Sequence, residues 1–507
     1  MKTTLSRRDF LNILSTLPLM PLLKAAPLKG FNRPATNQTL PNIILILFDA
    51  LSAFNLSLYG YPRKTCPNLE RLAQRANVYH GHHSAANFTT PSTASLFTGC
   101  NPWTHRAFGL SSLISAKVAP NNLFRLLGDT YHQIAFSQNI YADMLLYQCG
   151  RNLDEHLALD SFSLVSNAIY PKFFKRDAIF GLKSFDEFLF RREEAHGSLF
   201  LSILNDISLL LHLQNRAEKF KDIYPQGLPR LANTDVYFSL DRVMEGVMEL
   251  LNELPIPSFI YLHFMPPHAP YTPNKQFLGI FEDEWSPPTK KRHPLAPKIP
   301  TERLDTQRRR YDEYIANLDA EFGRLLDFME KAHLLENSYI MVTSDHGEMF
   351  ERGVIGHSTP LLFEPVIRIP LIISSPGQTK RQDFYTITSN VDLLPTLLTI
   401  AGLPTPAWCE GEVLPGFGDN GDLKRSIFII EAKKNPSFTQ LDKTTIALIK
   451  GKYKLVYYLG YRNYDHQYEF YDLENDPDEI ENLYPSHPLA AEMQEELMRA
   501  LQEKNLP

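Results

Sequence analysis

Two segments carry acidic and imidazole side chains at the ends of apolar runs typical of strands. In PNIILILFDA, residues 41–50, Asp49 follows the apolar run. In IMVTSDHG, residues 340–347, Asp345 and His346 follow a second run. Ligand sites of open α/β sheets form outside the carboxyl ends of the strands. Two carboxylates and an imidazole that converge there predict a site for a divalent metal ion.

A hydroxyl group lies between these segments in the sequence. In FTTPSTASLFTG, residues 88–99, Pro91 fits the first helical position and Thr90 fits the N-cap, so Thr89 lies just before a helix N-terminus. Backbone amides and the helix dipole favour an anion there. A metal lowers the pKa of bound water from about 15.7 to about 7, and the same shift for threonine corresponds to about 12 kcal/mol. Thr89 is therefore predicted to be both a metal ligand and the nucleophile that attacks an anionic ester.

Three histidines near the ends of predicted strands are candidates for the substrate side of this site. His263 and His268 lie in YLHFMPPHAPY, and His357 lies in VIGHST. His268 and His357 are predicted to bind the ester oxygens or to protonate the leaving group. His263 is predicted to contact the substrate, although a place in the core fits its position equally well.

The elements that must position these side chains alternate between strand and helix. Over residues 41–404 this alternation predicts an α/β fold, with a mostly parallel sheet covered by helices on both faces. Adjacent residues of a regular strand point to opposite faces. Asp345 and His346 can therefore reach one ion only if the chain turns there, and Gly347 permits that turn.

Two parts of the chain depart from the alternation. Residues 150–235 are rich in Phe and Leu and predict a helical insertion, either a lid or wall of the substrate cleft or an ordinary hairpin packed on the sheet. Residues 425–507 contain short strands and one terminal helix, which predict a small C-terminal antiparallel sheet domain of the α+β type.

Charge and the N-terminal residues indicate where the protein acts. The net charge of −6 argues against nucleic acid as a partner. Residues 1–27 contain Arg7 and Arg8 before a short apolar stretch that prolines interrupt, as in a bacterial twin-arginine export signal. We therefore expect export to the periplasm or the extracellular space by the twin-arginine route. No stretch is long enough for a transmembrane span.

Many ordered segments between residues 41 and 485 resemble the sulfatase family of the alkaline phosphatase superfamily. They are PNIILILFDA, YGYPRKTCPNLERLA, TTPSTASLFTG, HFMPPHAPY, YDEYIANLDAEFGRLL, TSDHGEMFERGVIGH, RIPLIISSPG, VDLLPTLL and YEFYDLENDPDEIENLY. The resemblance implies an α/β/α sandwich of the alkaline phosphatase type with a smaller C-terminal sheet domain. It also implies a site at the strand ends that cleaves esters.

Three positions depart from the family pattern. Sulfatases carry Cys or Ser, any residue, Pro, any residue and Arg, and the first of these becomes formylglycine. Here Thr89 takes the first position, where oxidation would give a ketone instead of an aldehyde, and Thr93 replaces the arginine as the substrate-binding residue. Ala50 replaces the usual second aspartate after the first strand, so one acidic ligand of a sulfatase-type calcium site is lost.

The remaining set is similar to the threonine-dependent phosphotransferase and phosphodiesterase branches of the superfamily. It consists of Asp49, Thr89, Asp345 and His346. This similarity implies one divalent metal ion, manganese, zinc or calcium, and cleavage of phosphate mono- or diesters through a covalent intermediate on threonine. The substrate is expected to be a small anionic ester, and a lipid headgroup is one possibility. Two alternatives stay open: a sulfuric ester hydrolase without formylglycine, and a non-catalytic binding protein on the same scaffold.

Overall fold

The computed structural model describes residues 40–166, 199–418 and 425–504. The expected export signal at residues 1–27 and part of the expected insertion, residues 167–198, lie outside the described residues. No helix of the described residues combines the length and the apolar character needed to cross a membrane.

An eight-stranded sheet forms the centre of the fold, in the order β10-β2-β9-β6-β1-β5-β3-β4. Its strands are β1 (Asn42–Phe48), β2 (Asn77–His83), β3 (His132–Ser137), β4 (Glu155–His156), β5 (Ser258–Phe264), β6 (Ser338–Thr343), β9 (Leu371–Ser374) and β10 (Gln382–Ser389). Strand β9 runs antiparallel to β2 and β6, and the other described pairings in this sheet are parallel. The prediction of a mostly parallel α/β sheet is confirmed.

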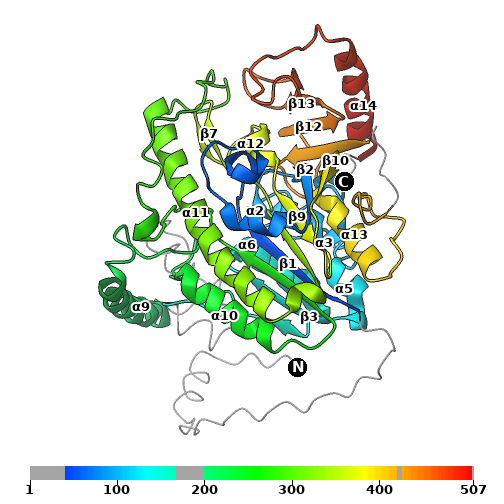
Figure 1. Ribbon diagram of the computed structural model, residues 1–507. Coiled ribbons are helices and arrows are strands. Elements are labelled where there is room, and N and C mark those ends of the chain that lie inside the picture. The colour runs from blue at the N-terminus through cyan, green and yellow to red at the C-terminus, as the bar shows by residue number, and fades with distance from the viewer. Residues whose placement is uncertain (1–39, 167–198, 419–424, 505–507) are drawn as a thin grey trace, which may run out of the picture. The chain divides into compact units, whose positions relative to one another are not determined.

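Helices cover both faces of the sheet (Figure 1). One face packs against α2 (Pro67–Ala73), α10 (Leu240–Asn252) and α11 (Thr301–Lys331), and the other against α3 (Thr89–Thr98), α5 (Leu123–Leu127), α6 (Ile140–Cys149) and α13 (Leu393–Ile400). Strand β1 is fully buried, because its alternate side chains enter both cores. Ile44 and Ile46 pack against the first helix layer, and Ile43 and Leu45 pack against the second.

Helix α10 illustrates how the sequence produces these layers. Its buried residues recur at a spacing of three or four and form one apolar stripe: Leu240, Val243, Met244, Val247 and Leu251. The stripe packs in the same core as the β1 side chains that point to this face. In the predicted insertion the structure describes helix α9 (Leu199–Phe220).

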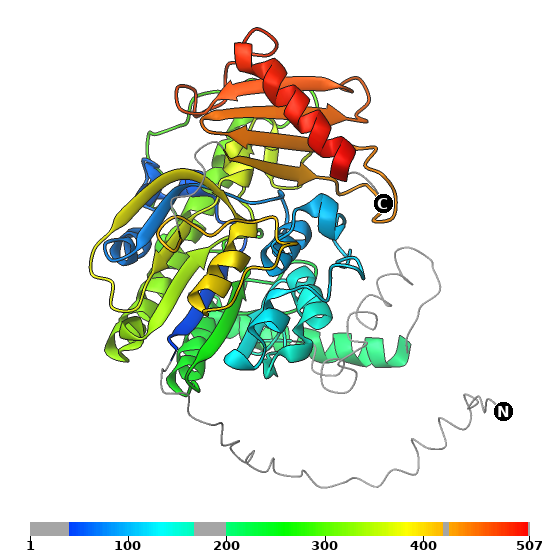
Figure 2. The same cartoon turned by 90° about the vertical axis from the view of Figure 1, so that its right-hand side faces the viewer.

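The C-terminal part of the chain forms a second sheet, in the order β11-β12-β13-β14 (Figure 2). The strands are β11 (Ser426–Glu431), β12 (Thr444–Lys450), β13 (Tyr453–Leu459) and β14 (Gln467–Asp472), and helix α14 (Pro488–Lys504) packs on one face. All three pairings are antiparallel. The prediction of a small C-terminal antiparallel sheet is confirmed.

Shorter elements complete the described chain. They are helices α4 (Pro102–His105) and α12 (Glu364–Ile367) and a hairpin of β7 (Met349–Glu351) and β8 (Val354–Gly356). The hairpin follows β6 by six residues, so it lies at the carboxyl end of the central sheet.

Candidate active site

Three neighbouring parallel strands bring the predicted acidic residues together. Strand β1 lies between β5 and β6, with Leu47 in register with both His263 and Thr343. Asp49 follows β1 directly after its last residue, and Asp345 follows β6 after one intervening residue. Because the three strands run in the same direction, their side chains converge at one edge of the sheet.

The converging side chains form a compact buried group. The His346 Nε2 atom lies 3.5 Å from Asp49 Oδ1 and 3.5 Å from Asp345 Oδ2. The His263 Nε2 atom lies 3.5 Å from Asp49 Oδ2 and 3.8 Å from Asp345 Oδ2. His346 Nδ1 donates a hydrogen bond to the Gly347 carbonyl, which leaves Nε2 free to bind an ion.

The donor atoms of this group suit a cation. Asp49 Oδ1, Asp345 Oδ2 and His263 Nε2 are buried, and none of them has a hydrogen-bond partner among the described residues. Such atoms are costly to bury unless something compensates them. One ligand atom each from Asp49, His263 and Asp345 lies within 4.8 Å of the others, as required of residues that hold one ion. His263, predicted to contact the substrate or to lie in the core, is fully buried beside the two carboxylates.

Backbone geometry after β1 and β6 aims these side chains. Ala50 has φ 63°, in the left-handed region that alanine adopts only with strain, and its N–H donates to Asp345 Oδ1 at 3.2 Å. The Ser344 hydroxyl donates to the Phe48 carbonyl at 2.7 Å and thereby joins the two strand ends. At Gly347 a Cβ would lie 2.2 Å from the Pro365 carbonyl. Glycine is therefore required at this position by the close packing against Pro365, and not only by the turn.

Thr89 lies beside the ion-binding group. Helix α3 begins at Thr89 with Phe88 as its N-cap, two residues earlier than the N-cap predicted at Thr90, and the Thr90 hydroxyl donates to the Leu110 carbonyl instead of capping the helix. The Thr89 Oγ1 atom lies 3.4 Å from His346 Nε2. Thr93, one turn along the helix, is fully buried.

Asn139 belongs to the same group, and sequence reasoning missed it. Its Nδ2 donates to Asp49 Oδ2 at 2.5 Å and to Thr89 Oγ1 at 3.1 Å. Its Oδ1 accepts from the Tyr141 N–H at 2.8 Å and caps helix α6. The sequence did contain a signal, because Asn139 is an N-cap residue just after a predicted strand. The structure adds that this strand, β3, lies beside β5 in the sheet.

His268 and His357 form the opposite wall with Glu348, a second residue that the sequence reasoning missed. The His357 ring centroid lies 4.2 Å from that of His346 and 5.0 Å from that of His268. His357 Nδ1 lies 2.5 Å from Glu348 Oε1, and the Tyr271 hydroxyl donates to Glu348 Oε2 at 2.7 Å. The structure therefore brings both predicted histidines to the strand-end site.

Charges across the site shift its pKa values. Burial would raise the pKa of Asp49, but His268 and His263 outweigh it and hold that pKa below its usual range. Burial likewise would raise the pKa of Glu348, and His357 outweighs it. Burial lowers the pKa of His357 to about 4. Burial alone would lower the pKa of His268, but the negative charges of Asp49 and Glu348 outweigh it and raise that pKa. The two carboxylates thus stay ionised at neutral pH, as cation binding requires.

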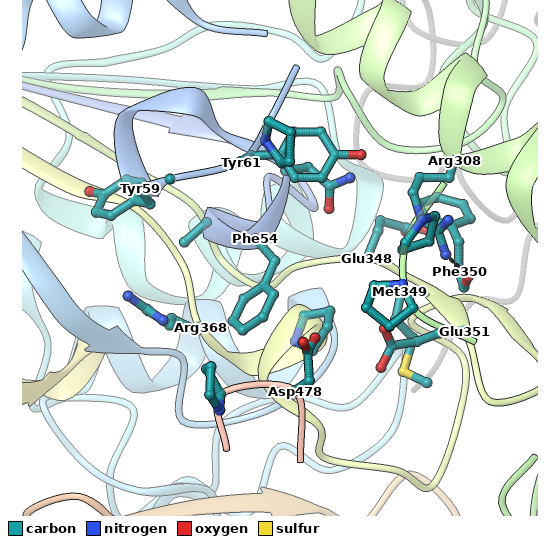
Figure 3. A pocket seen from close by; sticks show the side chains of 18 of the residues that line it. Phe54, Tyr59, Tyr61, Arg308, Glu348, Met349, Phe350, Glu351, Arg368 and Asp478 are labelled. Carbon is teal, nitrogen blue, oxygen red and sulfur yellow. Dashed lines mark hydrogen bonds between the residues drawn. The ribbon is translucent and has the colours of Figure 1, made fainter. Parts of the chain in front are cut away.

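Two hollows adjoin Glu348. A cleft beside His357 is also lined by Gln226, which follows helix α9, and by Arg310 of α11. Glu348 also lines a second pocket (Figure 3), in which the guanidinium carbon of Arg368 lies 5.5 Å from the centroid of the Phe54 ring. The His357 ring that lines the first cleft lies 4.2 Å, centroid to centroid, from the ring of His346 in the ion-binding group.

Comparison with known proteins identifies the family. The sulfatase profile matches residues 41–403, and the profile of the N-sulphoglucosamine sulphohydrolase C-terminal region matches residues 357–506. A choline-sulfatase of Rhizobium meliloti is 26% identical over 469 residues, which cover 87% of this chain and 82% of the relative. The rat N-acetylgalactosamine-6-sulfatase is 23% identical over 450 residues, with 86% and 74% covered.

Solved structures show the same fold. A phosphonate monoester hydrolase of Agrobacterium radiobacter superposes with a TM-score of 0.67 at 19% identity, over 92% of this chain and 96% of its own. A protein in complex with its substrate D-glucosamine-2-N,6-O-disulfate superposes with a TM-score of 0.63 at 18% identity, over 92% and 97%. Since the family profile covers well over half of the residues, the chain belongs to the sulfatase family and is an ester hydrolase.

Proposed function

We propose that this ester hydrolase is metal-dependent and cleaves phosphate mono- or diesters through a covalent intermediate on Thr89. One observation carries the proposal: the Thr89 hydroxyl lies 3.4 Å from His346 Nε2, beside buried carboxylate and imidazole atoms that lack hydrogen-bond partners among the described residues. A hydroxyl in that position suits a nucleophile better than a structural helix cap. Hydrolysis and transfer to an acceptor alcohol are both consistent with it.

In this proposal Asp49, Asp345, His346 and the Thr89 oxygen hold one divalent cation, and His263, whose ligand atom lies within 4.8 Å of those of both carboxylates, is a further candidate ligand. The imidazole ligand favours manganese or zinc, and the two carboxylates also suit calcium. A cation bound there would lower the pKa of the Thr89 hydroxyl and offset the negative charge of the ester.

The reaction steps follow from the positions of these side chains. The Thr89 Oγ proton passes to water, Oγ forms a bond to phosphorus, and the bond from phosphorus to the leaving oxygen breaks with its electron pair on that oxygen. Asn139 orients the Thr89 oxygen by donating to it at 3.1 Å. His268 and His357 lie on the opposite wall, where His268, whose pKa is raised by Asp49 and Glu348, would donate a proton to the leaving oxygen and the neutral His357 would donate a hydrogen bond. Water or an acceptor alcohol then attacks the phosphothreonine and releases Thr89.

Cleavage of sulfuric esters without formylglycine is the second candidate. The relatives named choline-sulfatase and N-acetylgalactosamine-6-sulfatase favour it, whereas the structural neighbour named phosphonate monoester hydrolase favours a phosphorus centre. We rank phosphate first because Thr89 cannot become an aldehyde and Thr93 replaces the arginine of the sulfatase pattern. Paired assays with nitrophenyl sulfate and nitrophenyl phosphate decide between the candidates, and a large preference for sulfate would reverse the ranking.

Replacement of Thr89 tests the mechanism. We expect Thr89→Ala to abolish turnover of an aryl phosphodiester, and we expect the wild-type protein to yield a phosphorylated Thr89 peptide after acid quenching. Thr98→Ala is the matched control, since Thr98 is buried in the same helix and its hydroxyl bonds the Ala94 carbonyl. Undiminished turnover by Thr89→Ala would exclude Thr89 as the nucleophile.

The site of action is a further part of the proposal. We infer export to the periplasm or the extracellular space by the twin-arginine route, from Arg7 and Arg8 ahead of the apolar stretch. A relative named as a putative extracellular sulfatase supports an exported location. Replacement of both arginines by lysine should retain the protein in the cytoplasm, which cell fractionation would detect.

A further inference from the structure

A lysine of the C-terminal sheet reaches the edge of the cleft beside His357. Lys433 lies two residues after the end of strand β11. Its Nζ donates to the Ser358 hydroxyl at 3.0 Å and lies 5.2 Å from the centroid of the Phe88 ring. Ser358 directly follows His357 and lines the same cleft. Phe88 directly precedes Thr89, so Lys433 lies between the segment with the proposed nucleophile and the opposite wall.

Backbone hydrogen bonds fix both partners of this contact. Ile430 of β11 donates its N–H to the Ala85 carbonyl at 2.9 Å, which joins the C-terminal sheet to the segment that leads to helix α3. Asn87 Nδ2 donates to the carbonyls on either side of Ser358, at 3.2 and 2.7 Å. The lysine and the serine are therefore held by the same short segment before helix α3, and their contact is part of the built site.

The ammonium group of Lys433 has no carboxylate partner. No ion pair within 4.0 Å involves its Nζ in the part of the chain that the structure describes. Glu431 Oε1 accepts from the Lys433 backbone N–H at 3.1 Å, and Glu431 Oε2 accepts from the Tyr461 hydroxyl at 2.7 Å. The side chain is partly buried, and burial lowers the pKa of the Lys433 ammonium. An anion beside it would offset the cost of burying this charge.

The cleft also needs positive charge for an anionic ester. Helix α3, which carries Thr89, contains no basic residue. Thr93 stands where the sulfatase pattern places arginine, and it is fully buried. Arg310 lines the cleft but is exposed, so water weakens its attraction for a ligand. Lys433 is the better placed cation, because it lies between Phe88 and Ser358.

We propose that Lys433 is a substrate-binding residue, whose ammonium group donates to an anionic oxygen of the ester and favours esters with two negative charges on phosphorus over esters with one. The inference rests on the proposed function, since it concerns the substrate of the Thr89 site. The neutral Ser358 hydroxyl would be exchanged for a stronger, charge-assisted hydrogen bond. A phosphate monoester, with a second pKa of about 6, carries both charges at pH 8, whereas a diester carries one.

A comparison of two esters tests this preference. At pH 8, Lys433→Met should lower kcat/KM about tenfold on nitrophenyl phosphate, mainly through KM, and less than about threefold on bis-nitrophenyl phosphate. Lys433→Arg should restore most of the loss, because it keeps a charged donor. Lys434→Met is the matched control, since it removes the adjacent, exposed lysine and the same charge; it should match the wild type on both esters.

Binding of inorganic phosphate tests the lysine without turnover. Isothermal titration calorimetry on the metal-loaded protein should show about tenfold weaker phosphate binding by Lys433→Met and unchanged binding by Lys434→Met. Equal losses on the two esters, or unchanged phosphate affinity in Lys433→Met, would overturn the inference. Lys433→Gln gives the same comparison if Lys433→Met does not fold, as judged by circular dichroism. The calorimetry does not depend on Thr89 as nucleophile, so a failure of the proposed mechanism is distinguishable from a failure of this inference.

Discussion

The amide of Asn139 joins the proposed nucleophile to the ion-binding group, and its replacement is a sharp test of the site. The Asn139 Nδ2 atom donates to Asp49 Oδ2 at 2.5 Å and to Thr89 Oγ1 at 3.1 Å. The residue is almost completely buried, with 4% of its surface exposed, so water cannot readily replace the lost donor. Asn139→Ala would leave both oxygens without this donor and would leave Asp49 freer to rotate.

The size of the effect follows from the kind of hydrogen bond lost. A hydrogen bond to a charged group contributes about 1.5–3 kcal/mol. If that energy orients Asp49 and Thr89 in the transition state, kcat/KM should fall about 10- to 150-fold at saturating metal. Loss of the donor to Thr89 also destabilises the deprotonated hydroxyl, so the acidic limb of the pH profile should move to higher pH by about one unit. Loss of the α6 cap should lower stability by about 1 kcal/mol.

Two further variants separate positioning from stability. Asn139→Asp keeps an acceptor for the Tyr141 N–H but cannot donate to Thr89, and it places a second negative charge beside Asp49. It should therefore lose activity as Asn139→Ala does while retaining the helix cap. Asn122→Ala removes a comparable cap, since Asn122 Oδ1 accepts from the Arg125 N–H of α5.

The assays are kcat/KM on an aryl phosphodiester across pH 5–10 and urea unfolding. Asn122→Ala should lose stability and keep its pH profile. The reasoning would be refuted if Asn139→Asp retained wild-type kcat/KM and the same acidic limb, because the hydrogen bonds to Asp49 and Thr89 would then have no part in catalysis.

Two other perturbations test the buried polar groups that support the fold. Lys454 is fully buried against Glu364 and Glu479, so Lys454→Met should lower the free energy of urea unfolding by about 3–5 kcal/mol. The control Lys452→Met removes a partly exposed lysine that pairs with Asp472 and Glu474, and it should leave that free energy nearly unchanged. Equal losses would show that the buried pairs add nothing. Burial lowers the pKa of His105 to about 3, so between pH 6.5 and pH 3 the unfolded chain binds a proton that the folded chain does not. The free energy of unfolding should therefore fall by about 1.4 kcal/mol for each pH unit of acidification below pH 6.5. In unfolding measured between pH 6.5 and 4, His105→Gln should flatten this dependence.

The sequence alone was sufficient for the features that depend on local pattern. Alternating apolar runs and helical stripes predicted the mostly parallel sheet and the layers around it, because periodicities of two and 3.6 residues are properties of single segments. Asp49 and Asp345 could be placed at the strand ends for the same reason, since each directly follows an apolar run. The start of the helix that carries Thr89 was predicted to within two residues from Pro91.

Only the tertiary structure decided which side chains share the site. Asn139 reaches Thr89 because β3 lies next to β5 in the sheet, and no local pattern specifies that order of strands. Glu348 and His357 meet because they flank the β7–β8 hairpin, in which Met349 pairs with Gly356, and the loop after β5 brings His268 to His357. His263 enters the carboxylate group through its register with Leu47. Strand order, strand register and the positions of the loops depend on packing between segments far apart in the chain. The sequence of a single segment does not specify that packing.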